Sequence, residues 1–148
     1  AAYLRVDTVN PPGNESRGVA YLKGLLNQAG IPSSSAESAP GRGNLWARLE
    51  GGDEPALILL HHIDVVPADA RYWKTDPLGG VIEDGYIIGR GALDMKGAGI
   101  MQLQAFKLKD LIEEGKNEME LTRDSFIQKI THLAVSYFCY STEIRFIL

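Results

Sequence analysis

The feature that most constrains the fold is the run ALILLHHID, residues 56–64, in which five apolar residues lead into two histidines and an aspartate. Apolar residues without alternation are typical of a strand covered on both faces, as in a parallel sheet. The polar residues His61, His62 and Asp64 follow that run, so we expect them at the carboxyl end of the strand. In open α/β sheets, ligands bind at this edge.

Two segments have apolar residues at helical spacing. This spacing predicts helices over residues 15–30 and 94–115, ended by Gly30 and Gly115 respectively. Helices of this kind bury one apolar face against the rest of the domain. In the second helix, the face expected to be buried carries Met101, Ala105, Leu108 and Ile112.

The remaining segments predict strands and turns. Residues 44–50 alternate apolar and polar side chains, and residues 132–140 are a second buried-type run, so both are expected to be strands. Residues 31–43 are small and polar, which indicates a loop or a poorly buried edge strand. In residues 81–88, VIEDGYII, the central Asp-Gly pair predicts a tight hairpin turn. Helices and strands therefore alternate, and the expected fold class is α/β.

Composition limits the classes of partner. Hydrophobic residues make up 45% and charged residues 23% of the 148 residues, as in an ordinary globular protein. A net charge of −4 gives no electrostatic reason to expect nucleic acid or an anionic membrane as a partner. No apolar run approaches the ~20 residues that span a bilayer. The single cysteine, Cys139, excludes an internal disulfide and fits a reducing compartment, so a cytoplasmic location is expected.

The chain starts AAYLRVDTVNPPG, without the basic and then apolar order of a signal peptide. It also starts without methionine, which is compatible with a processed chain or a fragment.

His62 and Asp64 form a pair with specific chemistry. Residues two apart in a strand point the same way, so His62 and Asp64 share one side and His61 faces the other. A neutral imidazole is a good zinc ligand, and a nearby carboxylate fixes its tautomer and raises its basicity. The triplet alone is common, however, and the alternative is a histidine that is simply satisfied at a strand end.

A second candidate is Asp94, within GRGALDMKGAG at residues 89–99. It lies between a glycine-flanked turn and a helix start, where an aspartate can serve as an N-cap. A phosphate loop is excluded, because Lys96 is followed by Gly97 rather than by a hydroxyl residue. Together with His62 and Asp64, Asp94 could complete a metal-binding cleft, since one carboxylate can bridge two zinc ions about 3.5–4 Å apart.

The segment LLHHIDVVPADARYWKTDPLGGVIEDGYIIGRGALDMKGAG, residues 59–99, resembles a family of co-catalytic zinc peptidases and amidohydrolases. This family includes aminoacylase, glutamate carboxypeptidase, acetylornithine deacetylase and succinyl-diaminopimelate desuccinylase. DTVNPPGNES, residues 7–16, is similar to the opening segment of the same family, and the likeness covers residues 1 to about 108. The matching elements are His62-Ile63-Asp64-Val65-Val66-Pro67, Trp73, Asp76-Pro77, Asp84-Gly85, Gly89-Arg90-Gly91 and Asp94-Met95-Lys96.

The resemblance implies a role for each matching site residue. His62 would bind one zinc ion, Asp94 would bridge two, and Asp64 would be the catalytic aspartate that holds and polarises His62. The implied reaction is hydrolysis of an amide bond in a small peptide or an N-acyl amino acid, with zinc activating water. The implied fold is a phosphorylase/hydrolase-like zinc-peptidase sheet flanked by helices. No chemistry is expected for His61, which is interpreted as structural, for Trp73 and Tyr86, interpreted as packing residues, or for Arg90 and Lys96.

The sequence departs from the family after the second helix. There the family has an adjacent Glu-Glu pair, in which the first glutamate is the general base and the second a metal ligand. At the corresponding place, after the strand HLAVS, this chain has Tyr137-Phe138-Cys139. The pair Glu113-Glu114 comes before that strand and is interpreted as a solvated helix end, and Cys139 as an inert cysteine rather than a substitute ligand.

These departures lead to an expectation for the whole chain. Residues 1–148 would form an incomplete, amino-terminal portion of the catalytic domain, with 109–148 divergent and the lid or dimerisation domain absent. Such a chain would hold one zinc ion or none, would be inactive alone, and would self-associate through an uncovered sheet edge. One alternative is a non-catalytic fragment or binding protein derived from the family. Another is an unrelated α/β binding module whose histidines are structural.

Overall fold

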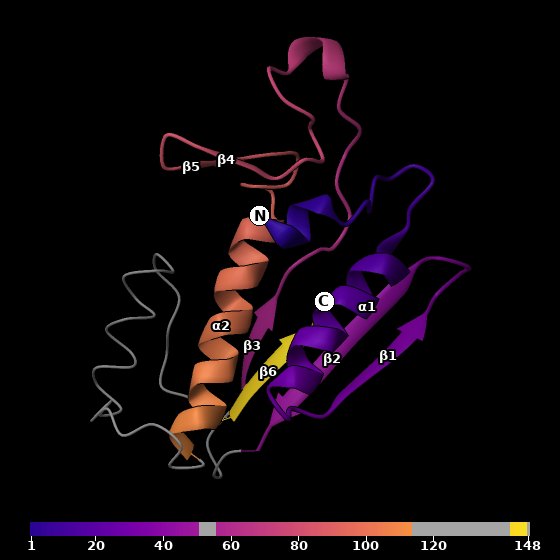
Figure 1. Cartoon of the computed structure of the whole chain (residues 1–148). Coiled ribbons are helices and arrows are strands. Elements are labelled where there is room, and N and C mark those ends of the chain that lie inside the picture. Colours follow the sequence, from indigo (N-terminus) through magenta and orange to yellow (C-terminus); the bar gives the residue numbers. More distant parts are fainter. Residues whose placement is uncertain (51–55, 114–142, 148) are drawn as a thin grey trace.

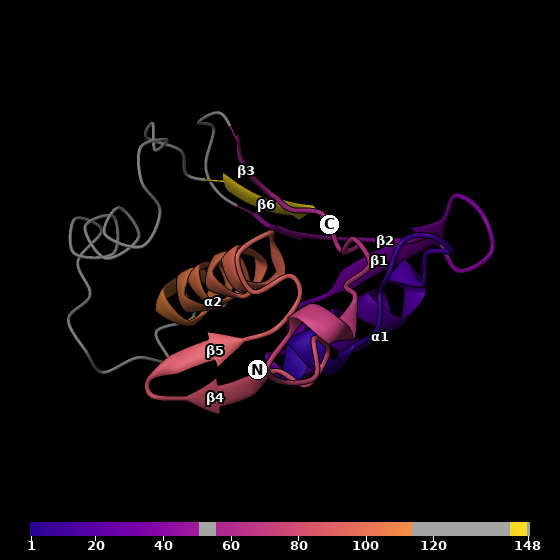
Figure 2. The same ribbon diagram turned by 90° about the horizontal axis from the view of Figure 1, so that it is seen from above.

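The computed structural model of the chain describes residues 1–50, 56–113 and 143–147 (Figure 1). Its main sheet has the strand order β1-β2-β6-β3, with β6 antiparallel to β2 and parallel to β3. The strands are β1 (Ser33–Glu37), β2 (Gly43–Leu49), β3 (Ala56–Leu60) and β6 (Glu143–Ile147). Helices α1 (Glu15–Gln28) and α2 (Lys96–Glu113) lie on the same side of this sheet (Figure 2), so the expected α/β class is confirmed.

The core forms where helix α1 packs on strand β2. Strand β2 alternates, with Leu45, Ala47 and Leu49 buried between exposed neighbours, as the sequence pattern predicted. Helix α1 contributes Leu22 and Leu26, which are fully buried. The predicted edge strand is also confirmed, because β1 is exposed over most of its length.

Strand β3 does not have the burial that the sequence predicted. A parallel partner is present in β6, but only one face of β3 is covered. Leu59 is buried toward the helices, whereas Ile58 is 52% and Leu60 is 60% exposed on the other face. The reason is that both described helices lie on one side of the sheet. The strand expected over residues 132–140 lies outside the described residues.

Helix α2 buries a different face from the one predicted. Met101 is 46% exposed, while Leu103 and Phe106 are fully buried. Lys96 and Gly99, in the first turn, also face inward. The prediction was wrong because the inward face begins with a lysine and a glycine, which no apolar pattern includes. Of the residues predicted to be buried, Ala105 and Leu108 are only partly so.

The predicted hairpin is confirmed as strands β4 (Val81–Glu83) and β5 (Tyr86–Ile88). Asp84 and Gly85 both have positive φ, 50° and 80°, as a tight two-residue turn requires. Two short 3-10 helices, η1 (Ala2–Arg5) and η2 (Ala70–Tyr72), complete the described elements. Within the described part of the chain, no helix combines the length and the hydrophobicity needed to cross a membrane.

Candidate metal-binding site

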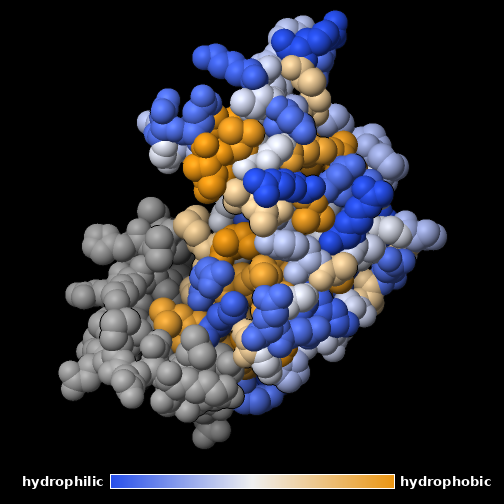
Figure 3. All heavy atoms as spheres, in the orientation of Figure 1, coloured by the Kyte–Doolittle hydropathy of each residue, from blue (hydrophilic) through white to orange (hydrophobic). Residues whose placement is uncertain are grey.

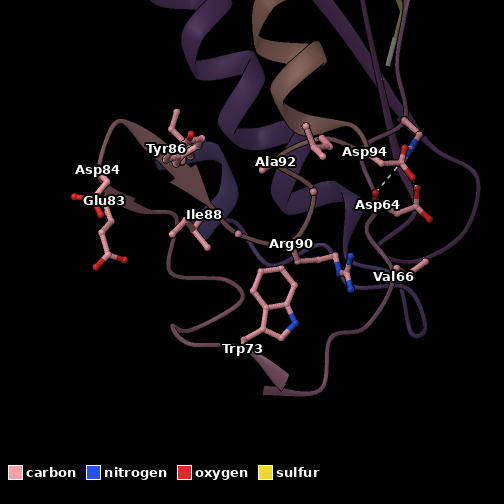
Figure 4. A pocket seen from close by; sticks show the side chains of 15 residues that line it. Asp64, Val66, Trp73, Glu83, Asp84, Tyr86, Ile88, Arg90, Ala92 and Asp94 are labelled. Atoms are coloured by element: carbon pink, nitrogen blue, oxygen red, sulfur yellow. Dashed lines mark hydrogen bonds and ion pairs between the residues drawn. The ribbon is translucent and has the colours of Figure 1, made fainter. Parts of the chain in front are cut away.

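The candidate site forms at the carboxyl end of β3, where the chain leaves the sheet. Val65 pairs with Val9 in an isolated parallel bridge, and the Thr8 hydroxyl donates to the Ile63 carbonyl at 2.8 Å. These contacts tie the segment that carries His62 and Asp64 to the amino-terminal segment. Asp94 comes from the loop between β5 and α2 (Figure 4).

The structure brings the three predicted site residues into one line of contacts. His62 Nδ1 lies 3.1 Å from Asp64 Oδ1 and 2.9 Å from the Asp64 backbone oxygen. On the other side of the ring, His62 Nε2 lies 2.9 Å from Asp94 Oδ1. The predicted convergence of these side chains is therefore observed, while their roles in metal binding stay predictions.

These contacts define the proton on the imidazole ring. A backbone carbonyl only accepts hydrogen bonds, so Nδ1 must carry the hydrogen that it donates to Asp64. In the neutral ring, Nε2 then presents a lone pair to the Asp94 carboxylate, and two acceptors would face each other. That arrangement requires either a second proton on the ring or a cation bound by both groups. The donor set thus fits a metal ion held between His62 and Asp94.

The electrostatics of the site favour the first of these two options, the protonated ring. Partial burial lowers the pKa of His62, but the hydrogen bond to Asp94 and the contacts with Asp64 outweigh it, so the pKa is raised. The pKa of Asp64 is lowered, first by the hydrogen bond from Asn10 and then by His62, although burial opposes this. Asp64 is therefore held as a carboxylate.

Asp94 contacts the histidine from a solvent-exposed position. Its side chain is 89% exposed, and helix α2 begins two residues later, at Lys96. Because the Asp94 carboxylate lies against the imidazole, the interpretation as a site residue is favoured over that of a simple helix cap.

His61 faces away from the site, as predicted. It is 3% exposed, and its Nδ1 lies 3.3 Å from Gln102 Oε1 on helix α2. A Cβ atom at Gly99 would overlap the imidazole ring, so the helix passes close against it. Burial lowers the pKa of His61 to about 4, despite the opposing hydrogen bond with Gln102. His61 is consequently neutral at pH 7 and packs between the strand and the helix.

A cleft of about 580 Å³ opens beside the site. The Arg90 guanidinium lies over the Trp73 ring at 5.4 Å, on the side of the cleft near Asp64 (Figure 4). Tyr86 is 72% exposed, so its prediction as a packing residue is wrong. It lies on strand β5 of the hairpin, where its side chain lines the cleft (Figure 4).

No sequence motif indicated Asn10, and Arg90 was given no role, because asparagine and arginine are not usual zinc ligands or general bases. The contact of Asn10 with Asp64, 54 residues away, depends on the tertiary fold. The only signal that could have indicated it is its position in DTVNPPGNES, the segment that resembles the family's opening.

The described residues do not form a complete metal centre. Among them, no group of three or more histidine, cysteine, aspartate or glutamate side chains is placed to hold a metal ion. His62 and Asp94 would supply two ligands, whereas zinc in proteins is usually held by three or four.

Residues 58–121 match the model of Peptidase family M20/M25/M40. The resemblance to this family of metal-dependent hydrolases is thereby confirmed for the amino-terminal part of the chain.

Two relatives illustrate the match. The chain is 45% identical over 117 residues to a succinyl-diaminopimelate desuccinylase of Methylobacterium sp. (strain 4-46), covering 76% of this chain and 28% of the relative. It is 39% identical over 109 residues to aminoacylase-1 of Sus scrofa, covering 71% of this chain and 26% of that protein. The chain thus spans little more than a quarter of the length of these relatives.

Solved structures show the same fold. The chain superposes on the M20 family metallo-carboxypeptidase Sso-CP2 from Sulfolobus solfataricus with a TM-score of 0.69 and 21% identity, covering 99% of this chain and 28% of that one. Human carnosine dipeptidase 1 gives a TM-score of 0.60 with 20% identity, covering 99% of this chain and 29% of that one. At this identity the likeness supports the fold alone.

Proposed function

We propose that this chain carries part of the active site of a zinc-dependent amide hydrolase. The observation that carries the proposal is the convergence of His62 Nε2 and Asp94 Oδ1 at 2.9 Å, two metal-ligand atoms that face each other. The match to the M20 family, over the segment that contains both residues, supports the same chemistry.

Each of the three side chains has a defined task in this proposal. His62 and Asp94 hold zinc, and Asp64 accepts the Nδ1 hydrogen, which fixes the tautomer that leaves Nε2 free to coordinate. Zinc bound there would supply a Lewis acid for the amide carbonyl and for water. The cleft beside these residues then receives the substrate.

A small acyl-amino acid or peptide is the proposed substrate class. Two relatives are named for the removal of a succinyl or other acyl group. A cleft of about 580 Å³ suits a molecule of that size. We propose no nucleic-acid or membrane partner, and the cytoplasm as compartment stays a prediction.

We further propose that this chain alone does not turn over substrate. The family's general base is a glutamate, and the corresponding positions, 137–139, are Tyr-Phe-Cys. Without that glutamate, the chain would lack the group that accepts the proton of the attacking water in the family. In domain terms, we propose that residues 1–148 represent part of a catalytic domain. The divergence expected over 109–148 is proposed for the residues beyond 121, where the family match ends.

Bound zinc tests the metal proposal. Zinc per chain is measured by elemental analysis after gel filtration, for wild type and for His62→Ala. Zinc retained by wild type and lost in the variant is expected. Its absence from both would contradict the metal role and favour a non-catalytic product of the family.

Turnover tests the proposal of inactivity. An N-acetyl amino acid and a dipeptide are incubated with the zinc-loaded chain, and no release of amine above background is expected. Hydrolysis by wild type that disappears in Asp64→Ala would show that another group replaces the missing base.

A further inference from the structure

Behind the candidate site, a chain of polar contacts runs from helix α1 to Asp64. Asn10 Nδ2 donates to Asp64 Oδ2 at 2.9 Å, and Arg42 Nη1 donates to Asn10 Oδ1 at 3.3 Å. Arg42 Nε lies 2.9 Å from Glu15 Oε2 as an ion pair. We propose that Asn10 is a positioning residue that fixes the Asp64 carboxylate, and that Arg42 and Glu15 hold Asn10 in the required orientation. This inference rests on the proposed function, because it concerns the same histidine.

The chemistry at the two ends of Asn10 permits only one orientation of its amide. A guanidinium only donates hydrogen bonds, so Arg42 must face the Asn10 oxygen. An ionised carboxylate only accepts them, so Asp64 must face the Asn10 nitrogen. A flipped amide would lose both hydrogen bonds. An aspartate at position 10 would place two carboxylates together, and an apolar residue could serve neither partner.

The backbone of Asn10 is fixed to the segment that it supports. The Asn10 amide donates to the Val65 carbonyl at 2.9 Å, and the Val65 amide donates to the Thr8 carbonyl at 3.1 Å. These two hydrogen bonds hold Asn10 beside Val65, the residue that follows Asp64. The side chain of Asn10 therefore extends from backbone that is hydrogen-bonded to the segment carrying Asp64.

Arg42 and Glu15 anchor the far end of the network. The Glu15 side chain is 9% exposed, and among the described residues its carboxylate oxygens receive no hydrogen bond. The positive charge of Arg42 is therefore the main described interaction that stabilises the buried Glu15 carboxylate. The Arg42 side chain crosses close to Gly13, where an added Cβ would lie 2.8 Å from Arg42 Cδ. Because Gly13 also has a φ of +91°, the chain there both turns and leaves room for the arginine.

The network decides which Asp64 oxygen is available to the histidine. With Oδ2 occupied by Asn10, Oδ1 faces His62 Nδ1 at 3.1 Å. Loss of Asn10 would free the carboxylate to rotate, and the ring would keep only the backbone oxygen of Asp64 as a fixed acceptor. Asn10 therefore acts on the metal-binding atom through two intermediates, Asp64 and the imidazole ring.

The test uses Asn10→Ala in the full 148-residue chain, with Asn27→Ala on the exposed side of α1 as the matched control. Long-range ¹H–¹⁵N spectra of the metal-free protein, recorded at a pH where the His62 ring is neutral, report the tautomer. Relative to wild type and the control, we expect Asn10→Ala to shift the ring from the Nδ1–H form, which donates to Asp64, toward the Nε2–H form, which donates to Asp94. Zinc affinity should fall about tenfold, as is typical of lost outer-shell support.

A second variant covers the case in which Asn10→Ala fails to fold. Arg42→Lys retains a cation beside Glu15 but serves Asn10 less well, so the same spectral shift is expected with a smaller amplitude. Unchanged His62 signals in a folded variant would overturn the positioning role. If wild type binds no zinc and the spectra still shift, the positioning role stands and the proposed metal function fails.

Discussion

At the scale of single residues, the candidate site depends on the contact between His62 and Asp94. His62 Nε2 and Asp94 Oδ1 are held at 2.9 Å from separate segments of the chain. Because the Asp94 side chain is 89% exposed, it contributes little to the packing of the fold. A residue that contributes little to packing yet is directed at a histidine is better explained by ligand binding than by stability.

Asp94→Asn separates these two explanations. The amide can donate to Nε2, so the lone pair that would bind zinc is occupied. We expect zinc affinity to fall at least about tenfold, while the free energy of unfolding of the metal-free chain changes by less than ~0.5 kcal/mol. Zinc titration and urea denaturation measure the two quantities. Asp69→Asn, an exposed carboxylate paired with Arg71, serves as the control. Unchanged zinc affinity in Asp94→Asn would contradict its assignment as a ligand.

Tyr3 predicts how stability depends on alkaline pH. It is 2% exposed, its ring stacks on Tyr21, and among the described residues its hydroxyl has no hydrogen-bond partner. Burial, and to a lesser extent Tyr21, raises the pKa of Tyr3 above its ordinary value of 10.0. The folded state therefore favours the neutral phenol. Its contribution to stability is complete below pH 10 and is lost progressively as pH rises further.

Tyr3→Phe keeps the stacked ring and removes the ionisable group. We expect the variant to equal or exceed wild type in stability at pH 8, by up to ~1 kcal/mol, and to lose less stability than wild type above pH 10. Urea denaturation at both pH values measures this, and Tyr72→Phe, at an 84% exposed position, should behave as wild type. Parallel pH profiles for wild type and Tyr3→Phe would exclude Tyr3 as the source.

At the scale of elements, structure that depends on neighbouring residues was predictable from the sequence, whereas structure that depends on distant contacts was not. The β4–β5 hairpin was predictable because Asp84 and Gly85 adopt the positive φ that their residue types favour. The orientation of α2 was not, because buried Lys96 directs its Nζ to the Val6 carbonyl at 2.6 Å, across 90 residues of sequence. Burial also lowers the pKa of Lys96 to about 8, although Asp7 opposes this. A buried lysine whose ammonium group donates to backbone carbonyls instead of water cannot be predicted from the spacing of apolar residues.

The corrected face of α2 gives a prediction with an internal control. Leu103 is fully buried and Met101 is 46% exposed, although they are two residues apart on the same helix. Leu103→Ala should lower the free energy of unfolding by about 3 kcal/mol, because it removes buried methyl groups and leaves a cavity. Met101→Ala should change it by less than ~1 kcal/mol. Chemical denaturation measures both, and equal losses would favour the face that the sequence pattern predicted.

At the scale of the whole molecule, the site combines segments that are far apart in sequence. His62 and Asp64 follow β3, Asp94 precedes α2, and Asn10 and Arg42 approach from the amino-terminal half. The motif residues were predictable because their types carry metal chemistry. The supporting residues were not, since an asparagine in a turn has many ordinary uses and only the assembled fold shows which one applies.

Apolar surface remains open on both sides of the molecule. Figure 3 shows hydrophobic side chains over the region of the β4–β5 hairpin, where Ile82 is 67% and Ile87 is 52% exposed. On the opposite face of the sheet, away from the helices, Trp46 and Leu60 are 43% and 60% exposed. Both pair with residue 147, so they lie on one row across three adjacent strands.

We predict that the chain self-associates through this sheet face and the neighbouring edge of β3. Among the described strands, β3 is the last in the order β1-β2-β6-β3, so its outer edge has no described partner strand. An exposed strand edge beside apolar side chains is a template for pairing with a second copy. Sedimentation velocity over a range of concentrations should show species larger than a monomer.

The double variant Ile58→Lys, Leu60→Lys should shift the distribution toward monomer, because charges on an open edge strand oppose pairing. Ile82→Lys, on the hairpin, is the matched control and should leave the distribution unchanged. A wild-type chain that stays monomeric at every concentration would contradict the prediction. If only Ile82→Lys abolished association, the contact between copies would be assigned to the β4–β5 hairpin. The exposed sheet face would then have no part in self-association.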